Sequence, residues 1–348
     1  MADMNENFKT ITDTSLYPFP KGCKSRIIHD TTGTGRAFLH DTAVTFYKDE
    51  LFVSWYSCPT GEIQGDSSIV GRASVDNGKN WSELFTIVSS ATNSSAKHFV
   101  PVSFINHEDG LFAIVSKMTA HDRPFAVELY KFDEKERAWF AVKEIFSLED
   151  DLSLIVNGNA VLAKNGNFVC GGRLAFGANK YPDIPCAIIS EGNDITKWKT
   201  VALSNSPVGN CPETTIAITA DGTLIAVTRN PEGTLTQISR DDGLSWAKID
   251  LPLPATPVKL YAYTLNSGKT LICFNGINPD GERNRLCLAT LDGLEVDKIY
   301  TVAYGKTDLG DIYHYPSLVE KEGVLYITCT LGAHPRHALL ITLPVSSL

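Results

Sequence analysis

Short runs of alternating apolar and polar residues fill most of the chain, and pairs of such runs flank a recurring turn signal. Alternation with a period of two residues is typical of strands that bury one face. Gly, Asn and Asp at the turns favour the tight backbone of a hairpin. Six hairpins follow one another at near-regular intervals, with turns at Lys48-Asp49, Asp109-Gly110, Asn165-Gly166, Asp221-Gly222, Ser267-Gly268 and Glu322-Gly323. The pattern therefore predicts an all-β protein.

The regular spacing of these hairpins predicts one repeated unit. Short strands with periodic turn and aromatic signals are typical of β-propellers. We therefore expect a single domain over residues 1–348, a six-bladed β-propeller of four-stranded antiparallel blades. Its expected parts are an irregular lead (1–22), a strand (23–29) and blades at approximately 36–90, 97–147, 153–204, 210–254, 257–303 and 312–348. The last repeat ends one strand short, so we expect the strand at 23–29 to complete blade six and close the ring.

Charge and composition argue against several classes of partner. The 348 residues carry a net charge of −9 with no basic block to offset it, so we expect no nucleic-acid partner. No apolar run approaches the ~18 residues of a membrane span, and we expect no membrane partner. The eight cysteines are scattered, which favours reduced core thiols. The first residues do not resemble a signal peptide, so we expect a cytoplasmic protein, or a secreted or periplasmic one if an export signal was trimmed.

Antiparallel strand order predicts where a binding site lies. In each blade, the start of the innermost strand, the end of the second strand and the loop after it share one face of the ring. Strand starts on this face hold His40, His98, Glu213, Lys259, His314 and Tyr315, strand ends hold Tyr56, Lys117, Arg173 and Arg229, and loops hold Glu62, Glu282 and Arg283. Charges around a buried axis are costly when unpaired. This concentration therefore indicates a site for an anionic ligand, the alternative being a solvated mouth. No metal-ligand spacing or phosphate-binding loop occurs, so we expect no metal and no cofactor.

One motif occurs twice, at residues 74–81 and 239–246, with the pattern S-x-D-x-G-x-x-W. Its Asp side chain can hydrogen-bond backbone amides, and its Gly permits a positive φ, which together suit a tight turn between strands. The motif resembles the Asp-box (BNR repeat) of the sialidase, or neuraminidase, superfamily. The resemblance extends over essentially the full chain and implies a six-bladed, sialidase-like propeller. Both copies are expected at turns on the face opposite the site, in a structural role.

The same resemblance implies catalytic roles for two residues. The stretch C-P-E-T-T-I at 211–216 looks like the family's Asn-Glu-Pro-Ser-Ile, which places Glu213 where the family has the carboxylate that activates a tyrosine. Y-P-S-L at 315–318 looks like Tyr-Ser-x-Leu, which makes Tyr315 the expected nucleophile. A tyrosine nucleophile is a recognised exception among glycosidases.

The resemblance also implies ligand-binding arginines and an acid. A-V-T-R-N at 226–230 is similar to the family's Ala-Arg-Asn strand end, so Arg229 is expected to bind a carboxylate together with Arg283, with Arg173 as a further candidate. The acid position before the third strand of blade one holds Glu62 where the family has Asp, with Asp66 as the alternative. His40 stands where the family has its first arginine. His314, Lys117 and His98 are expected pocket residues from strand position alone.

These features predict an exo-acting glycoside hydrolase, sialidase-like, that removes a terminal acidic sugar from a glycan. His40 in place of an arginine leaves open a different acidic sugar, such as a uronic acid. A second hypothesis is a polysaccharide lyase or His-dependent glycosidase acting on a uronic acid, with His40 or His314 moving the proton. A third is a non-catalytic propeller that binds glycans, because a fold does not dictate chemistry.

Overall fold

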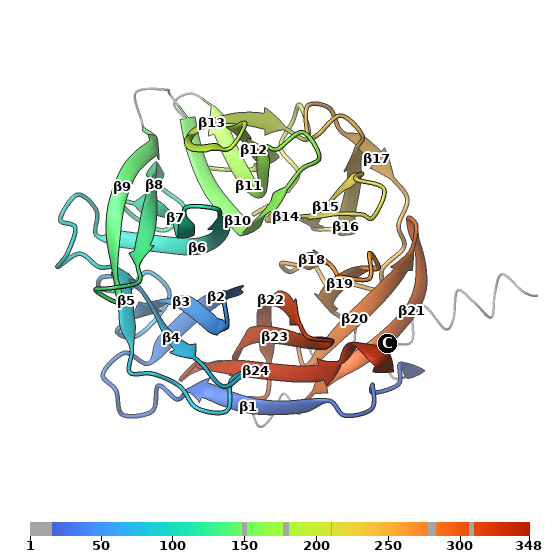
Figure 1. Ribbon diagram of the computed structural model, residues 1–348, viewed down its shortest axis with the longest axis horizontal. Coiled ribbons are helices and arrows are strands. Elements are labelled where there is room, and N and C mark those ends of the chain that lie inside the picture. Colours follow the sequence, from blue (N-terminus) through green and yellow to red (C-terminus); the bar gives the residue numbers. More distant parts are fainter. Residues whose placement is uncertain (1–15, 148–151, 177–180, 210, 278–282, 306–309) are drawn as a thin grey trace, which may run out of the picture.

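The protein forms a ring of six antiparallel sheets around a central axis (Figure 1). The computed structural model describes residues 16–147, 152–176, 181–209, 211–277, 283–305 and 310–348. Each sheet has four strands, which follow one another in sequence outwards from the axis in five of the sheets; in the sixth, the outermost strand comes from the start of the chain. The predicted six-bladed β-propeller is confirmed. No helix among the described residues is long and apolar enough to cross a bilayer.

The strands of the first three blades follow the hairpin pattern. Blade one holds β2 (Phe38–Tyr47), β3 (Glu50–Cys58), β4 (Ser68–Ser74) and β5 (Phe85–Val88). Blade two holds β6 (His98–His107), β7 (Gly110–Met118), β8 (Pro124–Asp133) and β9 (Ala138–Phe146). Blade three holds β10 (Leu152–Leu162), β11 (Phe168–Phe176), β12 (Ile184–Glu191) and β13 (Asp194–Ala202).

The other three blades continue the ring, and the last is completed from the other end of the chain. Blade four holds β14 (Thr214–Ile218), β15 (Leu224–Asn230), β16 (Gly233–Ser239) and β17 (Ala247–Ile249). Blade five holds β18 (Tyr261–Thr264), β19 (Thr270–Asn275), β20 (Arg285–Asp292) and β21 (Glu295–Tyr304). Blade six holds β22 (Tyr313–Lys321), β23 (Val324–Leu331), β24 (His337–Pro344) and β1 (Lys24–His29).

The ring closes where β1 pairs antiparallel with β24, for example Arg26 with Leu340 (blue beside red in Figure 1). The predicted closing strand is therefore confirmed. Pairing the first strand with the last repeat leaves no open edge between the ends of the propeller.

The core lies between neighbouring blades. One buried cluster joins Trp55 and Val53 of blade one to Tyr326 and Leu340 of blade six, and comparable clusters join the other blades. Side chains on both faces of a sheet can be buried in this way, so a strand such as β7 is buried along its whole length rather than at alternate residues. All eight cysteines are free, and six of them are buried.

The two S-x-D-x-G-x-x-W motifs form the same turn in blades one and four. In the first, the Asp76 carboxylate accepts hydrogen bonds from the backbone N–H groups of Lys79 and Asn80 at 3.0 and 2.8 Å. In the second, Asp241 accepts from Ser245 N–H at 2.9 Å. Each turn connects the third strand of its blade to the fourth. These turns therefore lie at the end of the blade away from the loops that join second and third strands.

Bulges in the innermost strands set the direction of side chains near the axis. The register of β2 shifts between His40 and Ala43, and that of β22 between His314 and Ser317. Inside these bulges Asp41 and Tyr315 adopt positive φ values of 53° and 51°. Such a bulge re-aims a side chain that regular alternation would send to the other face.

Candidate functional site

A cavity of about 240 Å³ opens at the axis, on the face that the strand order predicts. Seven of the ten predicted site residues line it: His40, Glu62, Arg173, Glu213, Arg229, Arg283 and Tyr315. They come from five of the six blades. The propeller thus brings residues that are far apart in sequence into one pocket.

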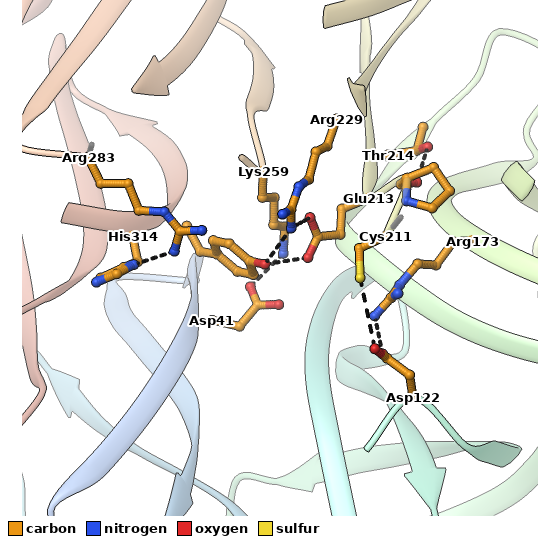
Figure 2. Close-up of polar contacts among 12 residues, drawn as sticks. Asp41, Asp122, Arg173, Cys211, Glu213, Thr214, Arg229, Lys259, Arg283 and His314 are labelled. Carbon is orange, nitrogen blue, oxygen red and sulfur yellow. Dashed lines mark hydrogen bonds and ion pairs between the residues drawn. The ribbon is translucent and has the colours of Figure 1, made fainter. Parts of the chain in front are cut away.

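Glu213, Tyr315 and Arg229 form a hydrogen-bonded group at this cavity. Figure 2 shows Glu213 beside Arg229. The Tyr315 hydroxyl donates a hydrogen bond of 2.5 Å to Oε1 of Glu213, whose other oxygen accepts one of 3.0 Å from Nη1 of Arg229. The backbone N–H of Arg229 also bonds to the carbonyl of Glu213 at 3.0 Å. Both carboxylate oxygens are therefore engaged, one by a phenol and one by a guanidinium.

The surroundings of Tyr315 keep its phenol protonated. Burial and the negative charge of Glu213 raise the pKa of Tyr315 well above its usual value, although Arg229 opposes them. The ammonium of Lys259 lies 5.3 Å from the centre of the Tyr315 ring, and the His40 ring lies 4.3 Å from it. A neutral tyrosine that already donates to a carboxylate can pass its proton along that bond when it attacks an electrophile.

Two of the predicted pocket histidines, His40 and His314, are neutral. His314 accepts a hydrogen bond on Nδ1 from Nη1 of Arg283 at 2.7 Å, and its Nε2 lies 3.2 Å from the carbonyl of Gly332. Burial and the charges of Arg336 and Arg283 lower the pKa of His314 to about 3. Burial and Arg336 likewise lower the pKa of His40 well below its usual range. His314 lies behind Arg283 rather than in the cavity lining.

Glu62 lies at the cavity rim beside a tyrosine and a histidine. The Tyr56 hydroxyl donates to Glu62 at 2.8 Å, and Nε2 of His121 lies 3.8 Å from the same carboxylate oxygen. Burial alone would raise the pKa of Glu62, but His121 and Tyr56 outweigh it, so that pKa is lowered. Hydrogen bonds to Asp122 and Glu62 raise the pKa of His121 to about 10. At rest, Glu62 is therefore a carboxylate and His121 an imidazolium.

On the blade-three side, Arg173 is tied to a carboxylate. Its Nη2 donates to Oδ1 of Asp122 at 2.6 Å, and both side chains are nearly fully buried. The other oxygen of Asp122 lies 3.1 Å from Nδ1 of His121. Burial opposes ionisation, yet His121 and Arg173 hold the pKa of Asp122 well below its usual range. In Figure 2 this ion pair lies on the opposite side of the group from Arg283 and His314.

A further ion pair lies beneath Tyr315. Nζ of Lys259 contacts Oδ1 of Asp41 at 2.5 Å, and both side chains are at most 9% exposed. Burial raises the pKa of Asp41 although Lys259 pulls it down. The pair joins β2 of blade one to the segment before β18 of blade five across the axis. Its position under the phenol ring makes it a support for Tyr315.

Three predicted candidates lie elsewhere. Lys117 is buried but bonds to Glu144 at 2.6 Å, within its own blade. His98 is buried at the start of β6 and does not line the cavity. Asp66, the alternative acid, pairs with Arg36 at 3.3 Å and also lies outside the lining. Glu282 falls outside the described residues.

Sequence reasoning missed four charged residues that line the cavity: Asp41, His121, Asp122 and Arg336. His121 and Asp122 lie in the loop between β7 and β8, and Arg336 in the loop between β23 and β24. Both loops join the second and third strands of a blade. The rule that placed Glu62 and Arg283 on the site face applies equally to them. Within the described residues, no group of three or more His, Cys, Asp or Glu side chains is arranged to hold a metal ion.

Comparisons with known proteins agree with this architecture. Residues 49–327 match a family described as a BNR repeat-like domain. No curated protein matches the chain. An intramolecular trans-sialidase from Ruminococcus gnavus superposes with a TM-score of 0.73 at 10% identity, over 94% of this chain and 98% of that one. A Dyadobacter fermentans protein of unknown function superposes with a TM-score of 0.72 at 14% identity, over 93% of this chain and 99% of that one.

Trypanosoma rangeli sialidase gives a TM-score of 0.70 at 15% identity, over 95% of this chain. The chain spans 59% of that enzyme's length. At such low identities the superpositions establish the fold alone, whereas the family match covers most of the chain. The chain therefore belongs to the family described as a BNR repeat-like domain, and it shares the six-bladed β-propeller fold of these sialidases.

Proposed function

We propose that the protein is an exo-acting glycoside hydrolase of the sialidase type, which removes a terminal acidic sugar from a glycan. The observation that carries the proposal is the Tyr315–Glu213–Arg229 group at the cavity, with its 2.5 Å phenol–carboxylate bond. Two of the solved relatives are sialidases or trans-sialidases by name, and one of these was solved with sialic acid bound. Arginines at the cavity suit a ligand carboxylate, because a guanidinium forms charge-assisted, bidentate bonds with it.

In the proposed reaction, Tyr315 Oη attacks the anomeric carbon while its proton passes to Glu213. The bond from that carbon to the leaving oxygen breaks, and Glu62 protonates the oxygen. Glu62, now a carboxylate, then takes a proton from a water molecule that attacks the anomeric carbon. Tyr315 leaves and recovers its proton from Glu213. Two successive displacements retain the anomeric configuration.

The cavity favours this scheme over proton transfer by a histidine. Both ring nitrogens of His314 are within hydrogen-bond distance of protein groups, Arg283 and the Gly332 carbonyl. His40 is buried against Tyr315, and its Nδ1 lies 3.2 Å from the Thr330 hydroxyl. Proton transfer by a histidine would need an imidazole nitrogen that reaches the ligand. The hydrogen-bonded Tyr315 and Glu213 at the cavity offer a more direct route for a proton.

Aryl glycosides test the proposal. We expect release of the phenol from aryl sialosides or aryl uronides, and none from the matched neutral aryl glucoside. A new ultraviolet absorbance from an unsaturated uronate would instead indicate a lyase. Binding of acidic glycans without turnover of any aryl glycoside would contradict the hydrolase and leave a glycan-binding propeller.

Replacing His121 by Gln is expected to increase activity at neutral pH. Glu62 must carry a proton to act as acid, so activity is lost as pH rises through the pKa of Glu62. His121 lowers that pKa. Without it, the alkaline limb of kcat/KM moves up by about one pH unit, which raises the neutral rate up to about tenfold.

The pH profile of kcat/KM from pH 4 to 9 measures this change. Lys97→Gln, on the same face but outside the cavity lining, serves as a control for a lost positive charge. A drop in neutral activity in His121→Gln, with no shift of the limb, would mean that His121 itself delivers the proton.

A further inference from the structure

The charges around the cavity are unevenly paired. Each of its four lining carboxylates lies within 3.8 Å of a cationic group: Asp41 of Lys259, Glu62 of His121, Asp122 of both Arg173 and His121, and Glu213 of Arg229. Each of these cations is therefore compensated by the protein. A compensated guanidinium attracts an incoming anion far less than a free one does.

Two lining guanidinium groups remain outside these pairs, Arg283 and Arg336. Neither forms an ion pair with a carboxylate in the described part of the chain. Nη1 of Arg283 donates to a neutral imidazole, that of His314. Nη1 of Arg336 is buried and has no hydrogen-bond partner among the described residues. A buried donor of this kind is costly unless something accepts from it.

The Arg336 guanidinium is held in place by its neighbours. Its backbone N–H bonds to the carbonyl of Ala37 at 3.0 Å, and its Nε to that of Ala333 at 3.3 Å. Its central carbon lies 4.3 Å from the centre of the Phe38 ring. Stacking and hydrogen bonds of this kind fix the plane of the group and preorganise it for a bidentate acceptor.

Arg283 and Arg336 also lie close enough to repel each other. Burial lowers the pKa of Arg336; Tyr56 and Glu62 oppose this effect, and the charge of Arg283 adds to it. The positive charges of Arg283 and Arg336 both lower the pKa of His314 and that of His40. The junction of blades five and six with blade one is thus a locally positive region. One anion between the two guanidinium groups would relieve the repulsion and accept from the unpartnered Nη1.

We infer that the ligand carboxylate binds between Arg283 and Arg336, and that Arg229 and Arg173 instead orient Glu213 and Asp122. The assignment to a sugar carboxylate rests on the proposed function, whereas the anion site itself does not. It changes the arginine set expected from the sequence, because Arg336 enters it and Arg229 leaves it. It also places the acidic group of the sugar over His40, where the family has an arginine.

Arg173 is the competing location. Its Nε and Nη1 are also buried without a partner among the described residues. Its charge, however, is compensated by Asp122 at 2.6 Å. Unpartnered donors therefore occur both at Arg173 and at Arg336, but within the described residues only the charge of Arg173 is compensated by a carboxylate. A small carboxylate probe distinguishes them directly.

Acetate tests the inference without needing turnover. Crystals of the wild-type protein soaked in sodium acetate are expected to show one acetate bridging Arg283 and Arg336. In solution, acetate at constant ionic strength should raise the melting temperature in a saturable way. Arg336→Gln and Arg283→Gln should each weaken this apparent affinity at least tenfold, since each removes a charge-assisted bond. Arg240→Gln, an exposed arginine in the blade-four turn motif on the other face, should leave it unchanged.

The outcomes separate this inference from the proposed function. Acetate bound at Arg173 or Arg229, no bound acetate, or an unchanged affinity in Arg336→Gln would overturn the inference, whatever the enzyme hydrolyses. Acetate at the expected place without turnover of acidic glycosides would uphold the anion site and reject the hydrolase. Where turnover is seen, Arg336→Gln should raise KM for the acidic aryl glycoside more than it lowers kcat, because the contact forms already in the bound substrate.

Discussion

Replacing Tyr315 by Phe is expected to lower kcat for an acidic aryl glycoside by about 10³-fold or more while KM changes little. The change removes only the hydroxyl that donates to Glu213. The ring keeps its place beside Lys259 and His40. Loss of a nucleophile removes the covalent path itself, which is why such changes cost several orders of magnitude in kcat.

Two matched variants define the result. Glu213→Gln keeps the shape of the side chain but cannot take the proton, so it should lose a comparable factor. Tyr313→Phe alters a tyrosine two residues away on β22 that does not line the cavity, and it should retain activity. Near wild-type kcat in Tyr315→Phe would reject the nucleophile and with it the two-step reaction.

The fold could be predicted because its signals are local and repeated. Each hairpin turn joins the two innermost strands of a blade, and the two S-x-D-x-G-x-x-W motifs mark the turns between third and fourth strands. The closing role of residues 23–29 followed from counting strands in the last repeat. The bulges in β2 and β22 could not be predicted, because one extra residue in a strand leaves no mark in an alternating pattern.

The site could be predicted only as far as strand ends determine it. Glu213, Arg229 and Tyr315 end or begin strands, and the structure brings them together. Loop residues depend on distant contacts: Arg336 is fixed by Phe38 and Ala37, almost the full chain away. No periodicity encodes such a contact. Strand position also does not fix which partner a long side chain takes.

Lys117 illustrates this last limit. It ends β7 on the site face, as the strand order predicts, but its ammonium turns to Glu144 and Glu128 of the same blade. Nearby carboxylates on adjacent strands compete for a flexible lysine. The register that brings them near is a property of the folded sheet rather than of residues around Lys117. The position of a residue at a strand end therefore predicts where its backbone lies, but not where the charged end of a long side chain lies.

Replacing Lys259 by Met is expected to lower the free energy of unfolding at neutral pH by about 3–5 kcal/mol, the usual cost of leaving one member of a buried ion pair unpartnered. Met keeps most of the apolar stem, so packing changes little. The Asp41 carboxylate, 9% exposed, would lose the cation that opposes the effect of burial on its pKa. The folded-state pKa of Asp41 would then rise further above its unfolded value.

The sign of the pH dependence follows from that rise. A carboxyl group whose pKa is raised by folding contributes stability that is full below its unfolded pKa and is lost as pH rises through its folded pKa. The stability gap between Lys259→Met and the wild type should therefore narrow as pH falls from 8 to 5, as urea unfolding at each pH would measure. Because Asn cannot ionise, Asp41→Asn combined with Lys259→Met should recover most of the loss and abolish this narrowing. A gap that is equal at both pH values, or a double variant no more stable than Lys259→Met, would show that Lys259 supports the axis by packing rather than by pairing with Asp41.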